Sequence, residues 1–126
     1  HKRKFVDRFL DMLKFLSKIF PRKEILPEVL TAIRWKMPSR LNVEISQSRD
    51  GGYIAVVKNL PGCITQGDNG QELFEMVNDA IYTYLDIPSQ YIPYLSYYLP
   101  SEELREKMKI KIPENILHQN LVLERI

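Results

Sequence analysis

The fold is decided by residues 41–85, which read LNVEISQSRDGGYIAVVKNLPGCITQGDNGQELFEMVNDAIYTYL. Apolar and polar side chains alternate from Leu41 to Ser46, which is the pattern of a strand with one buried face. Residues 49–52, Arg-Asp-Gly-Gly, are typical of a hairpin turn because glycine accepts the positive backbone angles that such turns need. We therefore expect residues 53–58 to return as a second, antiparallel strand.

A second turn and a capped helix follow the hairpin. Residues 59–62 form the turn, which predicts a short third strand over residues 63–66. Asn69 is placed to cap a helix, with Glu72 at the capping-box position. The apolar stripe of this helix consists of Leu73, Val77, Ala80, Ile81 and Tyr84. We therefore expect an α+β fold in which the helix packs on one face of an antiparallel sheet of three to four strands.

Residues 1–40 are expected to form a basic helical arm in front of this core. Apolar residues at spacings of three and four predict an amphipathic helix over about residues 2–20, and a second helix is expected from Pro27 toward Trp35. We favour packing of both apolar faces on the core or on a second copy over binding to a membrane surface or a calmodulin-like partner. Because the two helices offer more apolar surface than one small sheet face can cover, we also expect a homodimer or a larger homo-oligomer.

Residues 91–126 form a third segment, rich in tyrosine and proline, behind an expected core over residues 41–90. The run from Lys107 to Ile112 alternates strictly, which predicts a fourth strand. Its outer face would carry Lys107, Lys109 and Lys111, our candidate contacts to nucleic acid. The run is also similar to the strand that opens a ribbon-helix-helix DNA-binding domain. Since 13 residues follow Pro113, too few for the two helices of that domain, we favour the sheet strand.

The overall composition is that of an ordinary soluble domain, but the charge is uneven. The 126 residues are 44% hydrophobic and 27% charged, with a net charge of +2. Residues 1–40 carry eleven bases against four acids, whereas residues 41–90 carry two bases against seven acids. Charges interrupt the apolar stretch of the arm, so we expect no transmembrane span and no signal peptide. A lone cysteine favours a reducing compartment, and we expect a cytoplasmic protein.

Residues that could support catalysis are scarce. Cys63 is the single cysteine, and we expect a small buried apolar residue rather than a nucleophile because no histidine lies near it in sequence. The acids available for a metal-dependent nuclease fall in turns, a helix cap and an outer helix face; they are Asp50, Asp68, Glu72 and Asp79. We therefore expect no catalytic residue, no metal and no cofactor, and a protein that is not an enzyme.

Part of the chain resembles the HicB antitoxin family. The resemblance lies in residues 52–68, GYIAVVKNLPGCITQGD, and in the helix ending DAIYTYL at residues 79–85. The residues that carry it are Gly52, Tyr53, Leu60, Pro61, Gly62, Cys63, Gly67 and Asp68. It covers about residues 41–88 and implies a partial RNase H-like fold. Leu73 and Val77 stand where the family often has alanine, and the arm has no counterpart in the ordinary family pattern.

The same resemblance implies a non-catalytic protein that binds and masks a small HicA-type ribonuclease toxin and that also represses its own operon by binding operator DNA. Such a toxin must be basic to hold RNA, so we expect Glu75 and Asp79 to steer its approach. Tyr91, Tyr94 and Tyr97 are the expected aromatic anchors. Two alternatives stay open: a nucleic-acid-binding regulator that uses the arm or the lysines, and an orphan scaffold or oligomerisation protein with the same fold.

Overall fold

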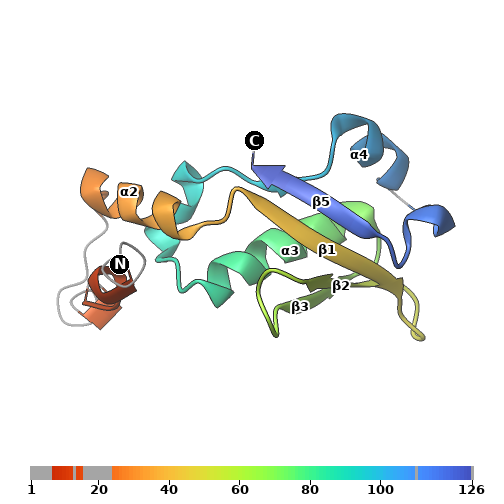
Figure 1. Ribbon diagram of the computed structural model, residues 1–126, viewed down its shortest axis with the longest axis horizontal. Helices are drawn as coiled ribbons and strands as arrows, with labels where there is room; N and C mark the ends of the chain where they lie inside the picture. The colour runs from red at the N-terminus through yellow and green to blue at the C-terminus, as the bar shows by residue number, and fades with distance from the viewer. Residues whose placement is uncertain (1–6, 13, 16–23, 110, 126) are drawn as a thin grey trace. The chain divides into compact units, whose positions relative to one another are not determined.

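The expected meander is present in the computed structural model, which describes residues 7–12, 14–15, 24–109 and 111–125 (Figure 1). Its strands are β1 (Arg40–Gln47), β2 (Tyr53–Val57) and β3 (Ile64–Gly67). Both neighbouring pairs are antiparallel, with Val43 opposite Val57 and Val56 opposite Ile64. Gly51 and Gly52 both have positive φ, as the hairpin turn requires. The three strands predicted from the alternating residues are therefore confirmed.

Two further strands from the end of the chain complete the sheet. β5 (Asn120–Arg125) pairs antiparallel with β1, which places Leu123 opposite Leu41. β4 (Tyr98–Leu99) pairs with β5 and forms the other edge. The order is β3-β2-β1-β5-β4, so the α+β prediction is confirmed with five strands rather than three to four.

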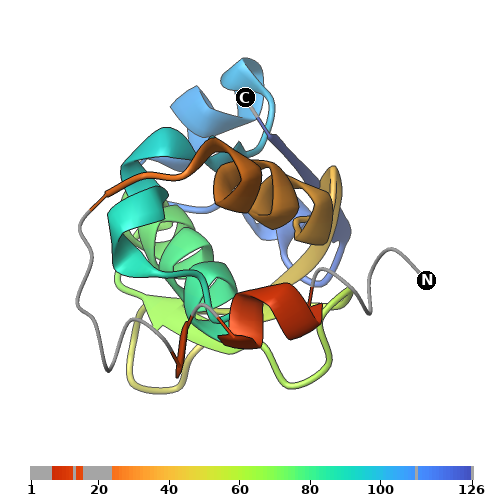
Figure 2. The same ribbon diagram turned by 90° about the vertical axis from the view of Figure 1, so that its left-hand side faces the viewer.

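The helix α3 (Gly70–Tyr84) lies along one face of this sheet, as predicted (Figures 1 and 2). Its buried residues include Leu73, Val77 and Ile81, which are 0% exposed. The Asn69 side chain accepts a hydrogen bond from the Glu72 backbone N–H at 2.9 Å, which confirms the predicted cap. A Cβ atom on Gly67 would lie 2.6 Å from the backbone nitrogen of Leu73, so only glycine allows the helix to approach β3 this closely.

The predicted strand over residues 107–112 is wrong. Its first two residues belong to α4 (Glu102–Met108), Lys109 has helical backbone angles, and Lys111 lies in a bend. The Ser101 side chain caps α4 by accepting a hydrogen bond from the Leu104 backbone N–H at 3.4 Å. The helix that begins after this cap continues to Met108 and so includes the first two residues of the alternating run. A short 3₁₀ helix, η2 (Glu114–Ile116), then leads to β5.

The chain divides into two compact units, and the sheet, α3 and α4 belong to residues 39–84 and 96–126. The other unit contains residues 1–38 and 85–95, with α2 (Pro27–Lys36) and η1 (Ser89–Tyr94), shown in orange and teal in Figure 2. The prediction of α2 is confirmed. Residues 7–12 and 14–15 are helical, as expected for the arm, whereas residues 2–6, 13 and 16–20 of that predicted helix lie outside the described residues.

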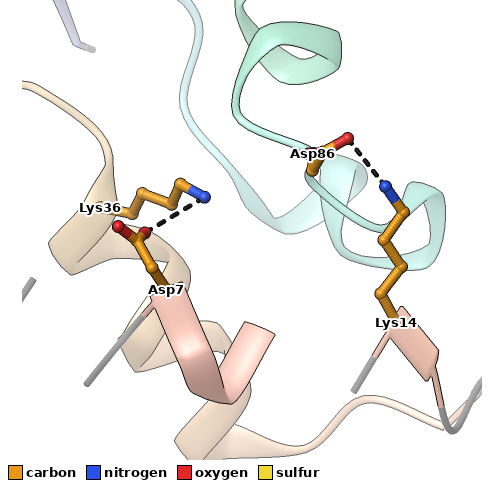
Figure 3. Close-up of polar contacts among 4 residues, drawn as sticks. All are labelled: Asp7, Lys14, Lys36 and Asp86. Atoms are coloured by element: carbon orange, nitrogen blue, oxygen red, sulfur yellow. Dashed lines mark hydrogen bonds and ion pairs between the residues drawn. The ribbon is translucent and has the colours of Figure 1, made fainter. Parts of the chain in front are cut away.

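One ion pair joins the arm to the rest of its own unit, and another joins two parts of the arm itself (Figure 3). Lys14 Nζ lies 2.9 Å from a carboxylate oxygen of Asp86, and Lys36 Nζ lies 3.3 Å from one of Asp7. Three of these four side chains are about half exposed, so each pair contributes about 1 kcal/mol or less to stability. The boundaries at residues 40 and 90 that the sequence suggested stay a prediction.

Candidate protein-binding surface

The exposed side of α3 carries Glu75 and Asp79, which the sequence assigned to partner binding, together with Glu72 of the predicted helix cap. Glu72, Glu75 and Asp79 are exposed and follow one another at spacings of three and four, so they lie on one side of the helix. We call these three residues the acidic stripe. The helix contains no lysine or arginine. The acidic stripe therefore lies opposite the buried side of α3 and has no base on its own helix.

No ion pair within the described part of the chain neutralises the acidic stripe. The ion pairs of this unit lie on the sheet and on α4, for example between Lys58 and Glu44. Met76, which is 38% exposed, follows Glu72 by one helical turn and adds an apolar side chain to the same side. The surface thus combines three carboxylates with an accessible methionine, whose flexible thioether adapts to different partner surfaces.

Tyr97 lies in the stretch that joins β4 to α3, the helix that carries the acidic stripe. Asn78 Nδ2 donates to the Tyr98 carbonyl at 2.9 Å, and Asn78 Oδ1 accepts from the Tyr98 backbone N–H at 2.7 Å. The Tyr82 hydroxyl donates to the Ser96 carbonyl at 3.3 Å. Tyr97, between Ser96 and Tyr98, is exposed and lies near Tyr82 of α3. Burial, and to a smaller extent Tyr97, raises the pKa of Tyr82.

Two of the predicted aromatic anchors belong to the other compact unit. Tyr91 is 3% exposed, and its hydroxyl accepts a hydrogen bond from the Leu26 backbone N–H at 3.1 Å. Its side chain is therefore part of the core of that unit. Tyr94 is 54% exposed, and its carbonyl accepts a hydrogen bond from Arg34 Nη2 at 3.4 Å. Of the three tyrosines, Tyr97 is thus the one that shares a compact unit with Glu75 and Asp79.

Sequence reasoning missed Asn78, the buried polar residue that positions Tyr97. Asn78 is 1% exposed, and its amide also donates to the Phe74 carbonyl at 2.8 Å. Its two bonds to Tyr98 imitate the exchange of hydrogen bonds between neighbouring strands. The available signal was a polar residue between Val77 and Ile81, on the apolar side of the helix.

The residues that carry the family resemblance have structural roles in this fold. A Cβ on Gly52 would lie 2.8 Å from the Gly67 carbonyl oxygen, so this position requires glycine. The Tyr53 hydroxyl accepts a hydrogen bond from the Ile112 backbone N–H at 3.1 Å, and the Pro61 carbonyl accepts one from the Tyr84 hydroxyl at 2.9 Å. Leu60 is half-buried, and Gly62, two residues later, has a φ of 85°. Asp68 is exposed just before α3. These contacts hold the turns against α3 and the carboxy-terminal segment.

The candidate catalytic residues lie at a buried cysteine, in turns and on α3. Burial raises the pKa of the Cys63 thiol, so it is neutral at pH 7 and a weak nucleophile. Asp50 and Asp68 are exposed at turns. Within residues 7–12, 14–15, 24–109 and 111–125, no three His, Cys, Asp or Glu side chains are grouped so that they could hold a metal ion. That the chain is not an enzyme stays a prediction.

The lysines proposed for nucleic acid do not form a row on one face of a strand. Lys107 Nζ lies 3.4 Å from a carboxylate oxygen of Glu103, and Lys109 Nζ lies 3.5 Å from one of Glu106. Lys111 is exposed in the bend that follows α4. The two ion pairs offset part of the positive charge that a phosphate would meet. In the portion of the chain that is described, no helix is long and apolar enough to cross a membrane.

Comparison with known proteins gives one partial similarity and no matching family model. The chain is similar to a UPF0150 protein from the archaeon Archaeoglobus fulgidus, with 42% identity over 45 residues. The matched segment makes up 36% of this chain and 65% of that protein, so it spans slightly less than two thirds of the relative's length. This chain therefore shares with a UPF0150 protein a segment of about the size of the β1–α3 region.

Proposed function

We propose that this chain is a HicB-like antitoxin that binds a small, basic HicA-type ribonuclease toxin through the acidic stripe of α3 and thereby masks it. The observation that carries the proposal is the exposed negative charge of Glu72, Glu75 and Asp79 on one helix side, which no ion pair among the described residues offsets. The family resemblance of residues 41–88 and the similarity to a UPF0150 protein support it.

The two kinds of side chain on this surface have different tasks in the proposal. Carboxylates attract a basic partner over a distance comparable to the Debye length, about 10 Å at 0.1 M salt, and so increase the association rate. Met76 and Tyr97 lose water when a partner covers them, and so lower the dissociation rate. The proposal thus assigns fast association to the acidic stripe and slow dissociation to Met76 and Tyr97.

Repression of its own operon belongs to the same proposal as a second, separate activity. Its support is the family resemblance. Lys107 and Lys109 add little support for DNA binding, because each forms an ion pair with a nearby glutamate of α4. The basic arm is the other candidate for DNA contact, and residues 1–6, 13 and 16–23 lie outside the described residues. The alternatives of a nucleic-acid regulator and an orphan scaffold make a different prediction, since neither requires a basic protein partner.

The proposal requires a small basic protein in a neighbouring reading frame, and the test produces that protein together with this chain. We expect the two to co-purify, the toxin's cleavage of RNA to stop in the complex, and the association rate to fall as salt rises. Failure of the complex to form at low salt, or continued RNA cleavage within it, would contradict the proposal.

A matched pair of tyrosine variants locates the binding surface. Tyr94 and Tyr97 have the same exposed fraction, 54%, but lie in different compact units. We expect Tyr97→Ala to raise the dissociation rate constant about tenfold or more, as for loss of an aromatic anchor, and Tyr94→Ala to change it by less than about twofold. Equal effects of the two substitutions would place the contact elsewhere than beside α3.

A further inference from the structure

Strand β3 lies at an edge of the sheet, as the first strand in the order β3-β2-β1-β5-β4 (Figure 1). The hydrogen bonds of its neighbour β2 show how the backbone groups of both strands are directed. The Val57 N–H donates to the Cys63 carbonyl at 2.9 Å, whereas the N–H of the next residue, Lys58, donates to the Asn42 carbonyl at 2.7 Å. Odd-numbered residues of β2 therefore bond toward β3, and even-numbered residues bond toward β1.

The register between β2 and β3 identifies the backbone groups that remain at this edge. Thr65 lies opposite Ala55, an odd-numbered residue, and so bonds to β2. Ile64 and Gln66 lie opposite even-numbered residues, and so direct their N–H and carbonyl groups away from β2. In the described part of the chain, no turn, loop or side chain forms a hydrogen bond with these groups. We call the backbone groups of Ile64 and Gln66 the free edge of β3.

The opposite edge of the sheet is capped within the chain. The Tyr98 backbone N–H of β4 donates to Asn78 Oδ1 at 2.7 Å, and the Tyr98 carbonyl accepts from Asn78 Nδ2 at 2.9 Å. Asn78 thus occupies the groups that an added strand would need. The sequence of β3, Ile-Thr-Gln-Gly, contains neither lysine nor proline, two residues that discourage pairing at an edge. Ile64 is 59% exposed and Gln66 is exposed, so another chain can reach the free edge.

The chain around the free edge is acidic. Residues 59–84 contain four acids and no lysine or arginine; the acids are Asp68, Glu72, Glu75 and Asp79. A Cβ on Gly67 would lie 3.1 Å from the backbone carbonyl carbon of Glu72, so the first turn of α3 lies over the end of β3. Asp68 is exposed and directly follows β3. An added strand that carries lysine or arginine gains electrostatic attraction at this end, whereas an acidic strand is repelled.

We propose that an extended, basic segment of the toxin pairs with the free edge of β3 and adds one strand to the five-stranded sheet. Main-chain hydrogen bonds to Ile64 and Gln66 hold this segment, as in other cases of strand addition to a sheet edge. Its alternate side chains project toward the α3 side, where lysine or arginine lies beside Asp68 and Glu72. The inference rests on the proposed function and specifies which part of the toxin binds and to which element.

The first test is amide hydrogen exchange, followed by NMR, of the full chain alone and in complex with the basic protein of the neighbouring reading frame. We expect the Ile64 and Gln66 amides to exchange freely in the chain alone and about 100-fold or more slowly in the complex. The Thr65 amide, which bonds to β2, is the internal control and should be protected in both.

The outcomes of this test separate the inference from the proposed function. A complex in which RNA cleavage stops, while Ile64 and Gln66 exchange as in the free chain, would overturn the pairing and leave the proposed function standing. Absence of a complex would overturn both.

A second test uses two substitutions of one residue. Gln66→Pro removes an N–H of the free edge and no bond to β2, and proline is tolerated in edge strands. Gln66→Ala is the matched control, because it removes the side chain and keeps the N–H. We expect Gln66→Pro to raise the dissociation rate constant of the complex about tenfold and Gln66→Ala to raise it by less than about twofold, with unchanged circular dichroism of both free chains. Equal dissociation rates of the two variants would contradict the pairing, and the exchange measurement on wild type decides the question if Gln66→Pro does not fold.

Discussion

Helix α3 has two sides that differ in what they contact. The buried side carries Leu73 and Val77, which are 0% exposed, and Asn78, which bonds to the backbone of β4. The exposed side carries the acidic stripe, which touches no base among the described residues. Under the proposed function, folding and partner binding would therefore depend on separate residues of one helix, and we expect that substitutions can change either one alone.

The largest effect is expected from Gly70→Ala, at the start of the buried side. In an exposed helix, alanine is about 1 kcal/mol better than glycine. Here a Cβ would lie 1.6 Å from the Met108 carbonyl oxygen, so α4 would have to move and the substitution should cost about 3 kcal/mol or more. Urea unfolding measures the loss. Gly51→Ala is the control, because its Cβ meets open space and only its φ of 90° adds strain, about 1 kcal/mol. Equal losses would refute the steric argument.

The next effect is expected from Asn78→Ala. The substitution removes both hydrogen bonds between Asn78 and the buried Tyr98 backbone, which should destabilise the fold by about 2–3 kcal/mol. Chemical denaturation gives the free energy of unfolding, and amide exchange at Tyr98 should speed up more than exchange in β1. Thr83→Ala, at an exposed position of the same helix, should change stability by about 0.5 kcal/mol or less. If Asn78→Ala were equally mild, the bonds to β4 would not matter for folding.

A smaller effect is expected at alkaline pH from Tyr98, which is 0% exposed. Burial raises its pKa to about 12 from an ordinary value of 10.0; Arg125 lowers it and Tyr82 raises it to smaller extents. Because the folded state favours the neutral ring, the contribution of Tyr98 to the free energy of unfolding is fully present below pH 10. It is lost as the pH rises toward 12. The free energy of unfolding should therefore decline more steeply from pH 9 to about 12 in wild type than in Tyr98→Phe. Parallel declines would show that Tyr98 ionises alike in both states.

The smallest effect on stability is expected from neutralising the exposed side. Replacing Glu72, Glu75 and Asp79 by Gln, Gln and Asn removes no ion pair seen among the described residues. Glu72 lies in the first turn of α3, where its charge interacts favourably with the helix dipole, so we expect a loss of about 0.5 kcal/mol. Thermal unfolding measures it. A loss comparable to that of Asn78→Ala would mean that the two sides of α3 are not separate.

The sequence predicted the regions in which local signals agree with tertiary contacts. Alternation, glycine turns and the Asn69 cap all indicated the meander and α3, and the structure contains them. The run from Lys107 to Ile112 also alternates, and Met108 and Ile112 are indeed buried. The alternation correctly indicated which of these side chains are buried but not the secondary structure. The reason is that Ser101 caps a helix that begins just before the run and continues into it.

The remainder could not be predicted because it depends on distant partners. β5 forms where β1 offers a free edge, about 80 residues earlier in the chain. The candidate surface was predicted in its charged part, Glu75 and Asp79, because exposed acids follow from helical spacing. In its aromatic part the sequence named Tyr97 together with Tyr91 and Tyr94, and could not separate them, because the burial of Tyr91 depends on its bond to the distant Leu26 backbone.

The most direct test of the central claim is the association rate constant with the basic toxin at about 50 mM salt, for two variants of equal charge change. One neutralises Glu72, Glu75 and Asp79 on α3, and the other neutralises Glu102, Glu103 and Glu106 on α4. If the acidic stripe steers binding, the α3 variant should associate about tenfold more slowly than wild type and the α4 variant about twofold more slowly or less, with the difference vanishing at high salt. Equal slowing by both variants would show that only net charge matters, and would contradict a binding site on the exposed side of α3.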